Sequence, residues 1–282
     1  MSAQPRQLEL ETVTGPSALG GGWKRFGELL YLISVTEFKR TYFGTVLGYF
    51  WSLLRPLLLF AVLLFVFTKI VRLGSDVPHY PVLLLFNVVL FGFFSESTTT
   101  AVMSVVSQES VVRKTQFPRL VIPLAVVMTA LFNLGANLIV VLVFIFAFGV
   151  SPQWTWLLFP VILVLLVTFA TAVSTLLSSL YVRFRDTAII WSVLASALFY
   201  ATPVIFPIER VPSAYRDLIL LNPLTPLFEQ ARKWVIDPDA PGAASAAGGW
   251  THLIAPAALF VAICAIGAWY FNREAPRIAE QL

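Results

Sequence analysis

The chain has 282 residues, of which 58% are apolar and only 12% charged. An ordinary soluble domain has roughly 45–50% apolar and about 25% charged residues, so water is not the main solvent of this chain. The single cysteine, Cys264, excludes a disulfide framework within the chain and a Cys/His metal cluster.

The N-terminal part of the chain predicts two segments ahead of the first membrane span. Residues 1–22 contain several glycines and prolines and cannot bury enough apolar surface to become ordered, so we expect a flexible cytoplasmic tail. Residues 23–40 place apolar side chains near one helical stripe and charged side chains largely elsewhere. This pattern predicts an amphipathic helix in the membrane interface. We expect it to begin a single transmembrane domain over residues 23–282.

Six apolar stretches follow, each long enough to cross a hydrocarbon core about 30 Å thick. They cover residues 44–70, 80–106, 120–148, 154–181, 188–206 and 252–270. Residues 207–250 are mixed in character, and we expect short re-entrant or interfacial helices there, because lipid-exposed irregular backbone is not tolerated. The predicted fold class is an all-α polytopic membrane protein with about six transmembrane helices.

The distribution of basic residues predicts the orientation in the membrane. With the N-terminus inside, twelve of the nineteen Lys and Arg residues fall in cytoplasmic segments, namely Arg6, Lys24, Arg25, Lys39, Arg40, Arg113, Lys114, Arg119, Arg183, Arg185, Arg273 and Arg277. Six fall in external segments, namely Lys69, Arg72, Arg210, Arg216, Arg232 and Lys233. This asymmetry predicts that both termini are cytoplasmic, as an even number of spans requires.

One basic residue, Arg55, lies inside the first predicted span. An arginine at the bilayer centre costs about 2.5–3.5 kcal/mol on insertion scales, so such a residue usually faces a bundle interior, a water-filled cavity or an anion. At helical spacing from Trp51, Arg55 could meet a phosphate or pyrophosphate entering from the cytoplasmic side. It could equally snorkel to the inner headgroups or pair with a carboxylate such as Glu96.

The second predicted span contains a polar run, residues 95–100, that includes Glu96. The run is too polar to face lipid. It could line a path for sugar hydroxyls, although interhelical hydrogen bonding is the default interpretation for each Ser and Thr. The aromatic faces of Tyr49 and Trp51 could stack on sugar rings as these move past. Packing within the protein is the default interpretation for both residues.

Residues 108–119 connect the second and third predicted spans on the cytoplasmic side. A short amphipathic helix in this loop, presenting Val112 and Phe117 to a partner, would let a soluble domain push on two spans at once. An ordinary positively charged cytoplasmic loop explains the same sequence.

Four motifs, in order along the chain, resemble those of the permease subunits of polysaccharide ABC exporters. They are LGYFWSLLRPLLL in the first span, RKTQFPRLVIPL before the third, YVRFRD before the fifth, and TPVIFP with NPLTPLFE after it. The likeness extends over residues 23–270. The chain is identified as a member of the type-2 ABC exporter family, whose members export O-antigen, teichoic acid, capsule or cell-wall galactan.

The resemblance implies a homodimer in the bacterial cytoplasmic (inner) membrane that pairs with two separately encoded ATPase subunits and moves a lipid-linked glycan. Contacts with the ATPase would involve the cytoplasmic loop residues Val112, Arg113, Lys114, Phe117, Pro118 and Arg119. The pyrophosphate-lipid head would enter near Lys39, Arg40, Tyr49, Trp51, Arg55 and Glu96. An external gate would be built by Thr202, Pro203, Phe206, Pro207, Asn222 and Pro223. Which glycan is exported stays open.

The sequence contains no G-x-x-x-x-G-K-[ST] phosphate loop. We therefore expect ATP and Mg to be bound, and ATP hydrolysed, by the partner ATPase, and this chain to be a transport subunit without enzymatic activity. No cofactor, metal or nucleic acid is expected on it.

Three other functions account for parts of the sequence. An ABC exporter of small molecules or drugs would share the same coupling motifs. A membrane-bound glycosyltransferase has some support in the D-x-D pattern of residues 237–239, but these residues are also typical of a turn. A secondary transporter or channel is disfavoured because no proton relay is visible within the spans.

Overall fold

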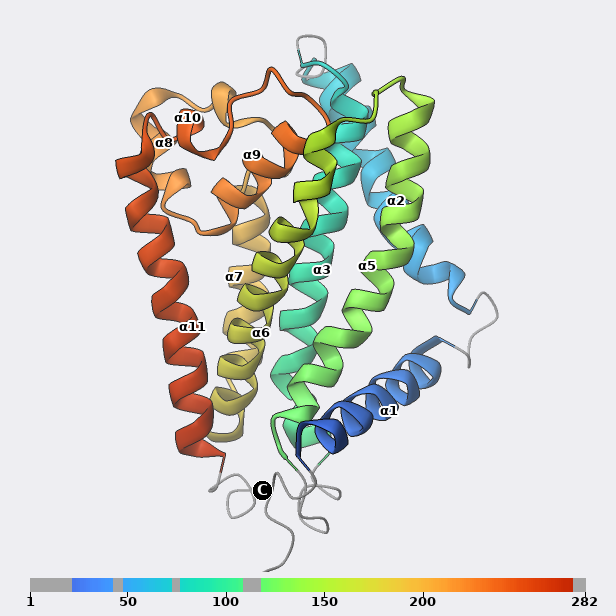
Figure 1. The fold of residues 1–282 in the computed structure, drawn as a ribbon, viewed down its shortest axis with the longest axis vertical. Coiled ribbons are helices and arrows are strands. Elements are labelled where there is room, and N and C mark those ends of the chain that lie inside the picture. The colour runs from blue at the N-terminus through green and yellow to red at the C-terminus, as the bar shows by residue number, and fades with distance from the viewer. Residues whose placement is uncertain (1–21, 43–47, 73–76, 109–117, 276–282) are drawn as a thin grey trace, which may run out of the picture.

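The computed structural model describes residues 22–42, 48–72, 77–108 and 118–275, and within these ranges it contains helices and no strand (Figure 1). The all-α prediction is confirmed for this part of the chain. The predicted tail, apart from Gly22, lies outside the described residues.

Within the described ranges, five helices are long and apolar enough to cross a membrane. They are α2 (Phe50–Phe65) continued by η1 (Val66–Ile70), α3 (Tyr80–Ser107), α5 (Val121–Ala147), η3 (Trp154–Leu158) continued by α6 (Phe159–Arg183), and η5 (Trp250–Leu253) continued by α11 (Ile254–Glu274). The central helix is α3, which contacts α2, α5, α6 and α7. In its most apolar window 78% of the residues are buried, against 6% for α2. The outer helices therefore expose apolar faces, as lipid or a second protein chain requires.

The remaining predicted span, 188–206, is not one long helix. Its helical part, α7 (Thr187–Ala201), has only 15 residues. Thr202 is extended, with φ −102° and ψ 145°, because a residue that precedes a proline is disfavoured in the helical conformation and Pro203 follows. The chain nevertheless continues antiparallel to α3: Trp191 contacts Thr98, and Ile205 contacts Tyr80, the first residue of α3.

The N-terminal helix α1 (Gly22–Tyr42) lies across the bundle at a steep angle to the long helices, at the lower end in Figure 1. It packs on α5, where the Thr129 hydroxyl donates to the main-chain oxygen of Ser34 at 3.3 Å. Ser34 is fully buried. The helix matches the predicted 23–40 segment, and its placement in the membrane interface stays a prediction. We call this end of the molecule the α1 end.

Short helices cover the opposite end of the bundle, as expected for residues 207–250 (Figure 1). They are η4 (Ile208–Arg210), α8 (Ser213–Leu220), α9 (Leu224–Val235) and α10 (Ala243–Ala246). The end of α9 is held by η3, because Thr155 Oγ1 and Trp156 Nε1 donate to the main-chain oxygens of Trp234 and Val235 at 2.6 and 3.0 Å. We call this end the α9 end.

The last long helix, α11, lies at the edge of the molecule and packs mainly on α6 (Figure 1). A Cβ atom at Gly267 would lie 2.5 Å from the main-chain oxygen of Ala172 in α6. Close approach of the two backbones therefore requires glycine at this position, as is common for helix packing in membranes.

Candidate substrate path and gate

The predicted basic residues Lys39 and Arg40 lie in the last turn of α1, and both are exposed. Arg40 Nη1 lies 3.7 Å from Glu37 Oε1, the same oxygen that accepts a 3.3 Å hydrogen bond from Gln108 Nε2. Because Gln108 directly follows α3, Glu37 joins the basic end of α1 to the end of the central helix. An exposed ion pair of this kind, between Arg40 and Glu37, is screened by water and contributes little to stability.

Three aromatic rings fix the corner between α1 and α2. The ring centroids of Phe38 and Tyr49 are 5.0 Å apart, and those of Phe38 and Phe132 are 5.9 Å apart, edge to face. The Tyr49 hydroxyl also donates to the main-chain oxygen of Phe132 at 3.4 Å. Tyr49 therefore has the packing role that was its default interpretation. The rings also fix the start of α2 next to the basic end of α1, and we call this region the α1–α2 corner.

Trp51 and Arg55 lie four residues apart on α2, which makes them neighbours on one helix face. Both are exposed, Trp51 by 47%. Among the described residues Arg55 makes no hydrogen bond or ion pair, and Glu96, its suggested partner, instead accepts from Asn133 Nδ2 at 2.6 Å. Pairing with Glu96, one of the alternatives for Arg55, is thus not observed. The guanidinium lies on the outside of the single chain, next to an aromatic side chain.

A polar seam joins α2, α3 and α5 in the interior. Besides the bond to Glu96, α5 contributes Asn137, whose Nδ2 donates to the main-chain oxygens of Ser52 and Asn133 at 3.3 and 2.9 Å. Sequence reasoning missed both asparagines, although they lie one helical turn apart in an otherwise apolar run. Buried amides of this kind are typical of hydrogen bonds between membrane helices.

Within the polar run of α3, Ser97 and Thr98 take part in interhelical hydrogen bonds, which is the default interpretation for each Ser and Thr of the run. The Ser174 hydroxyl of α6 donates to the main-chain oxygen of Ser97, and Trp191 Nε1 of α7 donates to Thr98 Oγ1 at 3.1 Å. Ser97 and Thr98 are fully buried, whereas Thr99 and Thr100 are exposed.

The two predicted gate segments lie in contact at the α9 end. Asn222 Nδ2 donates to Thr202 Oγ1 at 2.8 Å, and Asn222 Oδ1 accepts from the backbone N–H of Leu224, at the start of α9, at 3.1 Å. Thr202, Pro203 and Pro207 are buried, and so is Pro223, while Phe206 and Asn222 are half-buried. The structure therefore brings together the residues that the family resemblance had assigned to a gate.

Two residues of α3, which the sequence did not single out, contact the first of the predicted gate segments. Tyr80 donates its hydroxyl to the main-chain oxygen of Ile205 at 2.9 Å. Asn87 Nδ2 donates to the main-chain oxygen of Pro203 at 3.0 Å. No sequence pattern identifies these contacts, because each joins residues more than a hundred positions apart.

The predicted ATPase-contact loop is described only in part. Val112, Arg113, Lys114 and Phe117 lie outside the described residues. Pro118 and Arg119 are half-buried, and their main-chain oxygens accept hydrogen bonds from Val121 and Ile122 in the first turn of α5. The role of this loop stays a prediction.

Comparison with known proteins gives one family and a consistent set of relatives. The model of the ABC-2 type transporter family matches residues 28–235. An O-antigen export system permease protein of Klebsiella pneumoniae is 31% identical over 202 residues, which are 71% of this chain and 77% of that protein. Another, from Myxococcus xanthus, is 32% identical over the same shares.

Proposed function

The chain belongs to the ABC-2 type transporter family, and from that premise we propose that it is the transmembrane subunit of an ATP-driven exporter of a lipid-linked polysaccharide. The observation that carries the proposal is the identity of about one third with permeases named for O-antigen export, over most of both chains. The α1–α2 corner supports it, since exposed cations beside an aromatic side chain suit a phosphate-bearing lipid head with attached sugars.

In this proposal the α1 end faces the cytoplasm of a bacterial inner membrane, with both chain termini on that side. Basic residues at this end support the orientation by the positive-inside rule, namely Lys39, Arg40, Arg119, Arg183, Arg185 and Arg273. The five long helices give five membrane crossings, and α7 together with residues 202–206 would form the sixth. The loop between α3 and α5 would contact the ATPase, which supplies bound ATP and Mg.

The functional unit would contain two copies of this chain and two ATPase subunits. The sparse burial of α2 supports a second copy, because a long apolar helix that is only 6% buried must be covered by lipid or by protein. Arg55 and Trp51 would then line the path between the two copies. The pyrophosphate of the lipid carrier would be bound by Lys39, Arg40 and Arg55, and the segment held by Asn87 would have to shift to let the glycan leave.

Purification of the chain from its own cells tests this function. We expect a co-purifying ATPase in a two-plus-two complex, with ATP turnover that rises when a lipid-linked glycan is added. The control is the same complex with the phosphate-loop lysine of the ATPase replaced, which should bind the glycan without turnover. A chain that purifies without an ATPase would refute the proposal. Stimulation by small drugs but not by lipid-linked glycans would favour the drug exporter instead.

A further inference from the structure

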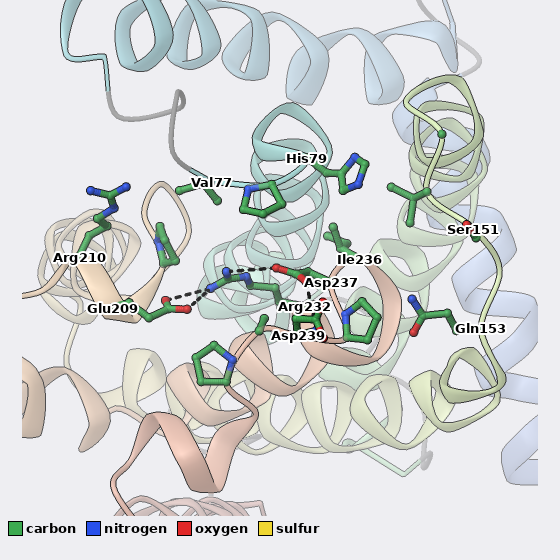
Figure 2. Close-up of a pocket in the computed structure, with 17 residues that line it drawn as sticks. Val77, His79, Ser151, Gln153, Glu209, Arg210, Arg232, Ile236, Asp237 and Asp239 are labelled. Atoms are coloured by element: carbon green, nitrogen blue, oxygen red, sulfur yellow. Dashed lines mark hydrogen bonds and ion pairs between the residues drawn. The ribbon is translucent and has the colours of Figure 1, made fainter.

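A cavity of about 620 Å³ lies at the α9 end, away from the α1–α2 corner (Figure 2). Its wall comes from four separate parts of the chain: residues 77–79 before α3, residues 149–151 with Gln153 before α6, Pro207 with Glu209 and Arg210 before α9, and Arg232 with residues 236–241 at the end of α9 and after it. Four of the lining residues are prolines, and each proline fixes its own φ angle. The volume falls in the range of roughly 300–1,000 Å³ that is usual for small-molecule sites. The cavity thus has the size and a preset backbone expected of a binding site.

A buried cation forms the floor of the cavity. The side chain of Arg232 is only 7% exposed, and its Nη1 lies 3.0 and 2.9 Å from the two carboxylate oxygens of Glu209. Its Nη2 lies 3.7 Å from Asp237 Oδ2, and its Nη1 also lies 3.5 Å from Oε2 of the buried Glu229. Figure 2 shows Arg232 between Glu209 and Asp237. Two carboxylates that line the cavity, Glu209 and Asp237, lie against Arg232, and Asp239 and Arg210 are also in the lining, so the cavity holds hydrogen-bond acceptors and no excess of positive charge.

Further polar groups around the cavity have hydrogen-bonding capacity to spare. In the part of the chain that the structure describes, the side chains of Asp239 and His79 are exposed and make no hydrogen bond or ion pair. Gln153 lies 3.3 Å from Thr155 Oγ1, and because the one proton of that hydroxyl is donated to Trp234, the Gln153 amide uses at most one N–H there and keeps another for a ligand. His79 also has φ 50°, a left-handed conformation that is uncommon in residues other than glycine. The cavity therefore presents donors and acceptors together.

We propose that this cavity binds a short stretch of neutral sugar units of the exported glycan as it leaves the transporter. Sugar hydroxyls both donate and accept, and so match a lining that contains both carboxylates and an amide donor. A phosphate would meet Glu209, Asp237 and Asp239, and a cation would meet Arg210 and Arg232, so neither fits the lining as well. An apolar ligand would leave the polar groups unpaired at a cost. The inference rests on the proposed function. In it, the cavity is a glycan-binding site on the external side of the transport path, and binding there hinders movement of the glycan back toward the cytoplasm.

The test uses cysteine labelling in cells that contain the complete transporter. In a Cys264→Ala background, which removes the chain's one cysteine, Ser151→Cys places a thiol on the exposed rim of the cavity. The control is Ser213→Cys, an exposed position at the same end that does not line the cavity. Each is treated with a membrane-impermeant maleimide, once in cells that make the lipid-linked glycan and once in cells that cannot. Surface glycan is measured in parallel.

We expect the Ser151→Cys thiol to react about tenfold more slowly during export, as a site about nine-tenths occupied would, and the Ser213→Cys thiol to react equally in both strains. Adding Asp239→Asn to Ser151→Cys should abolish the protection, whereas Asp217→Asn, on exposed α8, should not. Equal labelling of Ser151→Cys in both strains, with normal surface glycan, would overturn the cavity site alone. Failure of Ser151→Cys to react in either strain would do the same. Surface glycan that does not depend on this chain would overturn the proposed function itself.

Discussion

The side-chain amide of Asn87, in the first half of α3, donates to the main-chain oxygen of Pro203 at 3.0 Å and lies 3.4 Å from that of Val204. Both oxygens belong to the segment after α7 that has left the helix and so has no intrahelical donors. Asn87 and Val204 are buried. A single amide thus supplies the donor that water cannot, and it fixes the non-helical part of this segment against the central helix.

We predict that Asn87→Ala destabilises the protein by about 1–3 kcal/mol, because two buried carbonyl groups lose their donor. Thermal unfolding of the purified protein in detergent measures the change. Tyr80→Phe is the matched comparison, since it keeps the ring and removes only the bond to Ile205, and it should cost about 1 kcal/mol. Unchanged unfolding of Asn87→Ala would show that the segment is held by other contacts.

The exposed guanidinium of Arg55 gives a prediction about export. Arg55→Ala should lower export of surface glycan about tenfold at unchanged expression, because a hydrogen bond to a charged group contributes about 1.5–3 kcal/mol. Arg55→Lys keeps the charge but not the bidentate geometry, so its export of surface glycan should lie between that of Arg55→Ala and that of the unaltered chain.

Lys69 provides the control for Arg55, since it is an exposed cation at the other end of the same apolar segment. Lys69→Ala should leave export near the level of the unaltered chain. Export that is normal in Arg55→Ala would remove this residue from the substrate path.

The bond between Asn133 and Glu96 is predicted to couple α5 to α3 energetically. Interhelical hydrogen bonds in membranes contribute on average about 0.6 kcal/mol, with a maximum near 1.7. A double-mutant cycle of Asn133→Ala and Glu96→Ala, read out by thermal unfolding, should give a coupling energy within this range. Glu96→Gln keeps an oxygen acceptor and should be milder than Glu96→Ala. Strictly additive effects would contradict the coupling.

The five long helices were predictable because an apolar run of membrane length is a property of consecutive residues. The end of α7 at Ala201 was harder to predict, since the run continues to Phe206 and only the Thr202–Pro203 pair interrupts it. The proximity of Thr202 to Asn222 came from the family resemblance. Neither the support by Asn87 nor the network around Arg232 was predictable, because both depend on side chains that meet only after the chain has folded.

The Arg232 network also leads to a prediction about pH. Glu229 is in α9, outside the five long helices, and its burial raises the pKa of its carboxyl from 4.5 to about 7, although Arg232 and the backbone N–H of Ile208 oppose the shift. Arg232 also faces two other carboxylates: its bonds to Glu209, at 2.9 and 3.0 Å, are shorter than its distance to Glu229, and its Nη2 lies 3.7 Å from Asp237 Oδ2. Arg232 therefore does not fully compensate the burial of Glu229.

Between pH 4.5 and about 7 the folded chain holds this proton while the unfolded chain releases it. The contribution of Glu229 to the free energy of unfolding is therefore fully present below pH 4.5. It falls by roughly 3 kcal/mol at most as the pH rises to about 7. Glu229→Gln, which keeps an acceptor for Ile208, should flatten this slope, whereas Asp217→Asn on exposed α8 should not. The measurement is the difference in thermal unfolding between variant and unaltered chain at a series of pH values in detergent. A difference that does not vary with pH would mean that Glu229 is ionised throughout, held as an anion by Arg232.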